Sequence, residues 1–202
     1  MARLGYGLGG PHAKAPWLAC AVCLALASCG ARAPAGAFEP AAQTRELVTE
    51  ARSAAAERRY REAEALYERA IRQAPDPASR GYANREWGRA LALFGDYDEA
   101  IRALDRATQA APALAGAWHD LGVLRYRAGR VEGAEIALRR AASLRPRDPR
   151  PRIALAAMYV NAERFADARR RYLEVLDLDI PEDMREAIEE AMALLGEEER
   201  AR

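Results

Sequence analysis

The sequence predicts an all-α fold: an α-solenoid of about four helical hairpins followed by a C-terminal capping helix. Apolar and small residues recur at three- and four-residue intervals, which is the spacing of one face of a helix. The pattern repeats about every 34 residues, and glycine or proline separates the patterned segments. Because each hairpin has apolar faces that only a neighbouring hairpin can cover, we expect the hairpins to stack.

The clearest hairpin covers residues 115–148. Its first helix, at about 115–128, carries a stripe of Trp118, Leu121, Gly122 and Tyr126. After a break at Gly129 and Arg130, the stripe of the second helix consists of Val131, Ala134, Leu138 and Ala141, and the pattern ends near Pro146. The small residues Gly122 and Ala134 predict a close approach of the two helices, since a large side chain would hold them apart.

The same pattern recurs at residues 44–77, 81–114 and 149–182. It resembles the tetratricopeptide repeat family, whose 34-residue pattern runs Trp, Leu-Gly, Tyr, Ala, Phe, Pro. The best-matched positions are Trp118, Leu121, Gly122, Ala134 and Pro146. The resemblance covers roughly 140 residues and implies a right-handed α-solenoid that serves as a scaffold for protein partners.

Two positions depart from the family pattern. Arg125 stands where the family usually has tyrosine, and Arg152 replaces the first aromatic residue of the last hairpin. The first helix of residues 44–77 is also a degenerate copy, and three extra residues precede the next hairpin. The resemblance therefore indicates the fold more strongly than any particular partner.

The first 28 residues are expected to be a lipoprotein signal peptide. Arg3 and Lys14 precede an apolar run at 17–27, which is shorter than the about 20 residues needed to span a bilayer. The segment ends in Leu-Ala-Ser before Cys29, which resembles the bacterial lipobox and implies that Cys29 is lipidated. The alternative is an ordinary secretory signal.

The other two cysteines, Cys20 and Cys23, have the CxxC spacing of metal or redox sites. They lie inside the apolar run, so we expect them to be removed with the signal peptide.

The two ends of the repeat region have different compositions. Residues 29–43 are rich in Ala, Pro and Gly and are expected to form a flexible tether. The resemblance to bacterial lipoproteins also implies a location. Residue 30, which follows the lipidated cysteine, is glycine and not aspartate, and this implies that the protein is sorted to the outer membrane, facing the periplasm. Residues 183–202 are expected to form the capping helix and an acidic tail, with the helix ending at Gly196.

Charge excludes some classes of partner. Without residues 1–28 the chain has 29 basic and 30 acidic residues, so no overall field favours nucleic acid. Arginine is locally concentrated, in a run that consists of Arg139, Arg140, Arg145, Arg147, Arg150 and Arg152. We interpret this arginine run as a solvated helix face and its turn, with an anionic headgroup patch as the alternative.

Catalytic residue types are scarce after the signal peptide. His119 is the one histidine and only three serines follow Ser28, without any recognised catalytic or phosphate-binding motif. Asp96 and Asp98 form a carboxylate pair, but they lie where the second helix of their hairpin should begin. We therefore expect no enzyme activity, cofactor, metal or small-molecule substrate.

The first helices provide the candidate binding surface. If Trp118 and Leu121 face the second helix, the adjacent stripe faces outward, and the resemblance implies that such stripes line a concave peptide-binding groove. The candidate groove residues are Arg45, Arg52, Tyr82, Arg85, Arg89, His119 and Tyr126, with Val48 on the same stripe. Arginines and tyrosines suit a peptide with carboxylates and a few apolar anchors.

The sequence thus favours a lipid-anchored scaffold that binds a protein or peptide partner in the cell envelope. By its layout it resembles the pilotins that help to assemble pilus secretins, so an envelope complex such as a pilus or secretin is one expected setting. The alternative is an accessory, non-catalytic module of a cell-wall or polysaccharide enzyme complex. The arginine run stays open as an alternative interface.

Overall fold

The computed structural model describes residues 39–200. The expected signal peptide at 1–28, Cys29 and most of the expected tether lie outside the described residues. Within residues 39–200 every regular element is an α-helix, so the predicted all-α fold class is confirmed. The helices are α2 (Ala42–Ala56), α3 (Tyr60–Gln73), α4 (Pro77–Phe94), α5 (Tyr97–Ala110), α6 (Ala115–Arg127), α7 (Val131–Leu144), α8 (Arg150–Asn161), α9 (Phe165–Leu176) and α10 (Glu182–Arg200).

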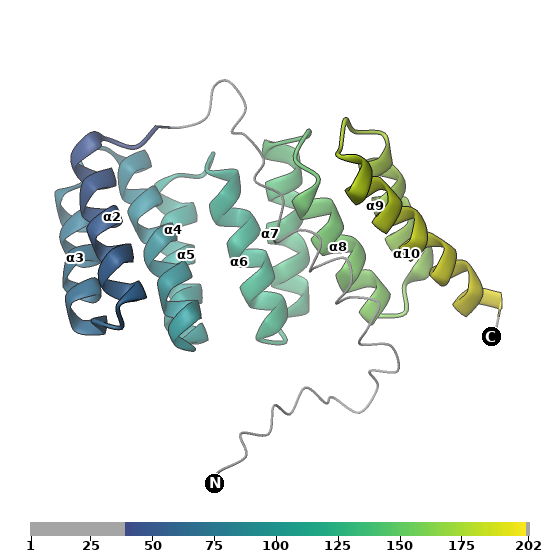
Figure 1. Cartoon of the computed structure of the whole chain (residues 1–202), viewed down its shortest axis with the longest axis horizontal. Helices are drawn as coiled ribbons and strands as arrows, with labels where there is room; N and C mark the ends of the chain where they lie inside the picture. Colours follow the sequence, from purple (N-terminus) through teal and green to yellow (C-terminus); the bar gives the residue numbers. More distant parts are fainter. Residues whose placement is uncertain (1–38, 201–202) are drawn as a thin grey trace, which may run out of the picture. The chain divides into compact units, whose positions relative to one another are not determined.

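The described chain divides into two compact units. The first runs to Ala154 and contains α2 to α7, and the second runs from Leu155 and contains α9 and α10. In the first unit the helices form three antiparallel pairs, α2 with α3, α4 with α5 and α6 with α7 (Figure 1).

In the first unit both helices of one pair pack against the first helix of the next pair. Helix α2 packs against α4, and α4 packs against α6, so these three helices form one continuous layer. The second helices α3 and α5 each pack against the first helix of the next pair, but in the described chain they do not pack against each other. The core between the layers contains Val48, Tyr67, Leu104 and Leu121, each at most 1% exposed.

Local sequence explains where these helices begin and end. Asp76 caps α4 by accepting a hydrogen bond from the Ser79 backbone N–H at 2.8 Å, and Pro77 occupies the first turn. Asp96 caps α5 through the Glu99 N–H at 3.1 Å, which confirms its predicted role. Gly129 has φ +74°, in the left-handed region that favours glycine, so the break predicted there is confirmed.

The predicted close approach within the third pair is also confirmed. A Cβ added to Gly122 would lie 2.6 Å from Leu138 Cγ and 3.1 Å from the Ala134 carbonyl oxygen. These distances leave no room for a side chain, so α6 and α7 pack in direct contact at Gly122.

Three helix limits differ from expectation. Helix α2 begins at Ala42, inside the expected tether. Helix α4 begins at Pro77, so the extra residues before 81 lengthen the helix, because Asp76 and Pro77 supply a start signal there. The predicted helix end at Gly196 is wrong, since α10 continues to Arg200. A glycine in a helix costs only about 1 kcal/mol, which the flanking helix-forming residues offset.

The second unit is built around α10, which packs against α9. Its buried side chains include Tyr172 and Val175 of α9 and Met184, Ile188 and Leu195 of α10. The buried side chains of α10 therefore form an apolar stripe that faces α9. None of the helices in residues 39–200 combines the length and apolar composition needed to cross a bilayer.

Candidate functional site

The predicted groove residues all lie on the first helices of the first unit. Helix α2 carries Arg45 and Arg52, α4 carries Tyr82, Arg85 and Arg89, and α6 carries His119 and Tyr126. All seven are exposed or half-buried, and together they are called the first-helix surface below. Val48 does not belong to it: the prediction was wrong here, because Val48 is fully buried in the core beside α4.

Tyr82 lies where α2 and α4 bring their arginines together. Burial raises the pKa of the Tyr82 hydroxyl, and Glu86 acts in the same direction. Arg52, Arg85 and Arg45 act in the opposite direction, so their positive charges lie close to this one side chain. Arg89 pairs with Glu86, which also lies near Tyr82. The structure therefore brings together five of the predicted residues: Tyr82, Arg45, Arg52, Arg85 and Arg89.

Two carboxylates that the sequence analysis missed hold part of this surface. Glu86 is 6% exposed, and Arg85 and Arg89 lie 3.5 and 3.3 Å from its Oε1 atom. Asp120 accepts a hydrogen bond from Arg85 Nε at 2.7 Å and lies 3.3 Å from Nδ1 of His119. The sequence shows that Glu86 is next to Arg85 and three residues before Arg89, which is close enough for ion pairs on a helix. It does not show that Glu86 is buried and Asp120 half-buried.

Asp120 is ionised in this network. Its burial acts to raise the pKa, but the hydrogen bond with His119 and the positive charge of Arg85 outweigh that effect, so the pKa of Asp120 lies below its ordinary value. Arg85 and His119 are thus committed largely to Asp120. A partner would have to displace this carboxylate to reach the Nε atom of Arg85.

The exposed arginines are the ones available to a partner. Arg45 pairs with Glu39 at 2.9 Å, but both side chains are more than half exposed, so this ion pair is weak. Arg52 has no ion-pair partner within residues 39–200 and is exposed. The first-helix surface is therefore less basic than the sequence predicts. Arg52, beside Tyr82, is its exposed arginine without an ion-pair partner in the described chain.

Tyr126 and the arginine run complete the residues that the sequence singled out. Tyr126 is half-buried on α6, seven residues beyond His119. In the run, Arg150 donates to Asp148 at 2.9 and 2.6 Å, and Arg152 donates to the Pro146 carbonyl at 2.8 Å. These bonds stay within one turn, which agrees with a structural role for that part of the run.

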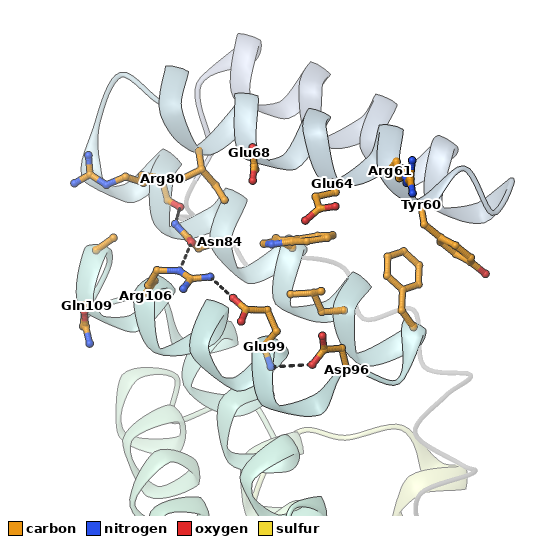
Figure 2. A pocket seen from close by; sticks show the side chains of 15 residues that line it. Tyr60, Arg61, Glu64, Glu68, Arg80, Asn84, Asp96, Glu99, Arg106 and Gln109 are labelled. Carbon is orange, nitrogen blue, oxygen red and sulfur yellow. Dashed lines mark hydrogen bonds and ion pairs between the residues drawn. The ribbon is translucent and has the colours of Figure 1, made fainter.

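A further depression of the first unit lies on the other layer. It is a cleft of about 820 Å³ between α3 and α5, with α4 as its floor (Figure 2). We call it the second-helix cleft, and its lining residues include Glu64, Glu68, Trp87, Leu91, Asp96 and Glu99. The sequence analysis missed it because the repeat pattern shows which faces pack, not how far apart two second helices lie.

The described residues provide binding groups more readily than reactive ones. In residues 39–200 no three His, Cys, Asp or Glu side chains are grouped so as to hold a metal ion. The first-helix surface instead offers guanidinium groups, a half-buried phenol and fixed carboxylates. This arrangement can form ion pairs and bury a small apolar group, which is the chemistry of peptide recognition.

Two family models match the chain, both described as tetratricopeptide repeat. They cover residues 48–112 and 91–150, and so between them just over half of the chain. This chain belongs to the tetratricopeptide repeat family. Repeats of this kind form scaffolds for protein interaction that are generally non-catalytic.

Several solved structures share the fold of this tetratricopeptide repeat protein. MamA is 19% identical with a TM-score of 0.58, over 66% of this chain and 77% of MamA. Yeast Tom70 is 24% identical with a TM-score of 0.67, over 78% of this chain but only 34% of Tom70. Pseudomonas aeruginosa PilF is 17% identical with a TM-score of 0.59, over 77% of this chain and 74% of PilF.

At these identities the similarities show the fold alone. No curated protein matches the sequence. Partner and location must therefore be inferred from this chain's own residues.

Proposed function

We propose that this tetratricopeptide repeat protein is a lipid-anchored scaffold that binds a protein or peptide partner in the cell envelope through its first-helix surface. The observation that carries the proposal is the cluster around Tyr82, where arginines of α2 and α4 face one half-buried phenol. Arg52 and Arg89 are exposed there and can reach carboxylates of a bound segment.

The chemistry of the surface defines the partner segment. Guanidinium groups pair with carboxylates in bidentate fashion, which gives orientation as well as affinity. Tyr82 supplies apolar area that a partner side chain can cover. The partner segment is therefore acidic, with at least one apolar residue next to its carboxylates.

Charge reversal at Arg52 tests the surface. Because Arg52 has no ion-pair partner in the described chain, Arg52→Glu should leave the fold intact and reduce capture of the partner in intact envelopes about tenfold. Capture is measured by chemical crosslinking and mass spectrometry. Arg85 is unsuitable for this test, since its reversal would also leave Asp120 without its ion-pair partner.

Arg140→Glu is the matched control. Arg140 is an exposed residue of the arginine run, so its reversal makes the same change in charge on a different surface. The proposal expects Arg140→Glu to retain capture. Loss of capture in Arg140→Glu with normal capture in Arg52→Glu would move the interface to the arginine run.

The anchor and the envelope location follow from the sequence around Cys29. A lipidated Cys29 would hold the repeats close to a membrane, and the absence of aspartate at residue 30 favours the outer membrane. Assembly of a pilus or secretin is one setting that fits this layout, and a cell-wall or polysaccharide enzyme complex is the other.

Removal of the modified thiol tests the anchor. Cys29→Ala should shift the protein from the membrane fraction to the soluble fraction, measured by immunoblotting of separated fractions. If Cys29→Ala stays with the membranes after a high-salt wash, the lipid anchor is refuted and partner binding alone would be tested next.

A further inference from the structure

The floor of the second-helix cleft is apolar and aromatic. Trp87, Leu91 and Phe94 lie four and three residues apart on one face of α4, and all three line the cleft. The rings of Trp87 and Phe94 lie 6.4 Å apart, and Tyr60 packs edge-on against Phe94 at 4.6 Å. Behind Trp87, the buried ring of Tyr67 lies 5.0 Å away, so the floor is held in place before anything binds.

Carboxylates line both walls of the cleft. Figure 2 shows Glu64 and Glu68 of α3 on one side of the space above α4, and Glu99 of α5 with its N-cap residue Asp96 on the other. Glu99 is engaged by Arg102 and Arg106, and Glu68 by Arg72. Glu64 is exposed and has no ion-pair partner within residues 39–200.

The lining charges are not evenly distributed. Arg80 and Arg106 lie together with Asn84 and Gln109 at one end of the cleft (Figure 2). Towards the end where Tyr60 lies, Glu64 and Asp96 face a single lining arginine, Arg61. The aromatic half of the cleft is thus the acidic half, and aromatic faces next to carboxylates favour a cationic side chain.

The size of the cleft fits a helix. The lining positions on α4 extend from Arg80 to Phe94, which corresponds to about 20 Å along the helix axis. Helices α3 and α5 both pack on α4 without packing against each other in the described chain, so they border a trough that runs along α4. A helix of about four turns can lie in such a trough, with its apolar stripe on Tyr60, Ile71 and Phe94, which are exposed or half-buried. Trp87 and Leu91 lie beneath them and are almost fully buried.

We propose that the second-helix cleft binds an amphipathic helix of a partner protein whose apolar stripe is bordered by lysine or arginine. The apolar stripe covers the floor, and a basic side chain reaches Glu64 and Asp96 over the aromatic rings. This surface is separate from the first-helix surface and selects the opposite charge. The scaffold would therefore hold two different partners at once.

Two model peptides test the proposal with the full-length chain. Both are fluorescein-labelled helices of about 15 residues with one leucine stripe, bordered by lysine in one peptide and by glutamate in the other. We expect saturable binding of the lysine peptide, and at least about tenfold weaker binding of the glutamate peptide, by fluorescence anisotropy. Glu64→Arg should weaken binding of the lysine peptide about tenfold.

The controls separate this site from general attraction between charges. Glu46→Arg makes the same change at an exposed glutamate of α2, outside the cleft, and should leave binding unchanged, as should Arg52→Glu on the first-helix surface. An NMR spectrum of the ¹⁵N-labelled protein gives a third readout. The indole N–H signal of Trp87 is identified as the one that is lost in Trp87→Phe, and this signal should shift when the lysine peptide is added.

Three results would overturn the proposal. One is equal weakening by Glu64→Arg and Glu46→Arg, which would indicate non-specific attraction. Another is an unmoved Trp87 signal at saturating peptide. The third is self-association that Glu64→Arg abolishes while the lysine peptide fails to compete, because a second copy of the chain would then occupy the cleft.

Discussion

Arg85 joins two neighbouring hairpins through their first helices. Its guanidinium group bonds Asp120, which lies 35 residues further along the chain, about one repeat away. It also lies against Gly116, where an added Cβ would be 2.9 Å from Arg85 Cζ. A side chain at residue 116 would push the guanidinium group off α6. We therefore assign Arg85 to holding α4 and α6 together, and Arg52 to contact with a partner.

The Asp120 ion pair predicts a specific pH dependence of stability. The folded pKa of Asp120 is below its unfolded value of about 4, so its ionised form stabilises the fold above about pH 4. That contribution is lost as the pH falls through the folded pKa. Asp120→Asn should lower the free energy of unfolding by about 2 kcal/mol at pH 7, measured by urea denaturation.

The comparison with the wild-type protein at low pH is the check on that prediction. The difference in unfolding free energy between wild type and Asp120→Asn should shrink as the pH is lowered below about 4. A difference that stays constant from pH 7 down to the acid limit would show that Asp120 is not a stabilising carboxylate.

Sequence reasoning reached the surface residues but not their pairing. The register of the repeats predicts that Arg85, Arg89 and His119 face outward from the first helices, and all three are exposed or half-buried. It could not show that Asp120 would meet Arg85, since that contact depends on the separation of α4 and α6. The sequence also could not show that Glu86 is buried. A glutamate next to an arginine is typical of an exposed position, and its burial depends on the neighbouring helices.

At the scale of helices, close packing of each pair depends on small residues. Gly122→Ala should destabilise the first unit by about 2 kcal/mol, because the new methyl group would meet both Leu138 and the Ala134 backbone oxygen. The backbone contact is the decisive one, since it cannot be relieved by a side-chain rotation. Urea denaturation followed by far-UV circular dichroism measures the change.

Gly133→Ala is the matched control for this effect. Gly133 is also a helical glycine of the same pair, but an added Cβ there would meet only the flexible Arg125 side chain, at 3.3 Å. Its substitution should be neutral or stabilising by up to about 1 kcal/mol, from helix propensity. Equal destabilisation by both substitutions would contradict the explanation from close packing.

The limits of the elements show what local signals can predict. The break at Gly129 and the cap at Asp96 are short-range features, and both were predicted correctly. Gly196 carries the same local signal as a helix end, yet α10 continues through it. The stripe of Ile188 and Leu195 buried against α9 stabilises α10 on both sides of the glycine more than the glycine costs.

At the scale of the molecule, the first unit presents two surfaces of different character. The first-helix surface offers exposed arginines beside Tyr82, and the second-helix cleft offers carboxylates over an aromatic floor. The near-neutral charge of the whole chain hides this contrast, because basic and acidic residues cancel in the sum. Composition alone could therefore exclude an overall positive charge that attracts nucleic acid, but it could not predict the two surfaces.

The central claim is that the first-helix surface contacts the partner, and photocrosslinking in living cells tests it most directly. A photoreactive phenylalanine analogue replaces Tyr82 in one variant and Ile136 in another, a residue of α7 that is 65% exposed. The account predicts a covalent adduct with one protein from position 82 and none from position 136. An adduct from position 136 with none from position 82 would contradict it.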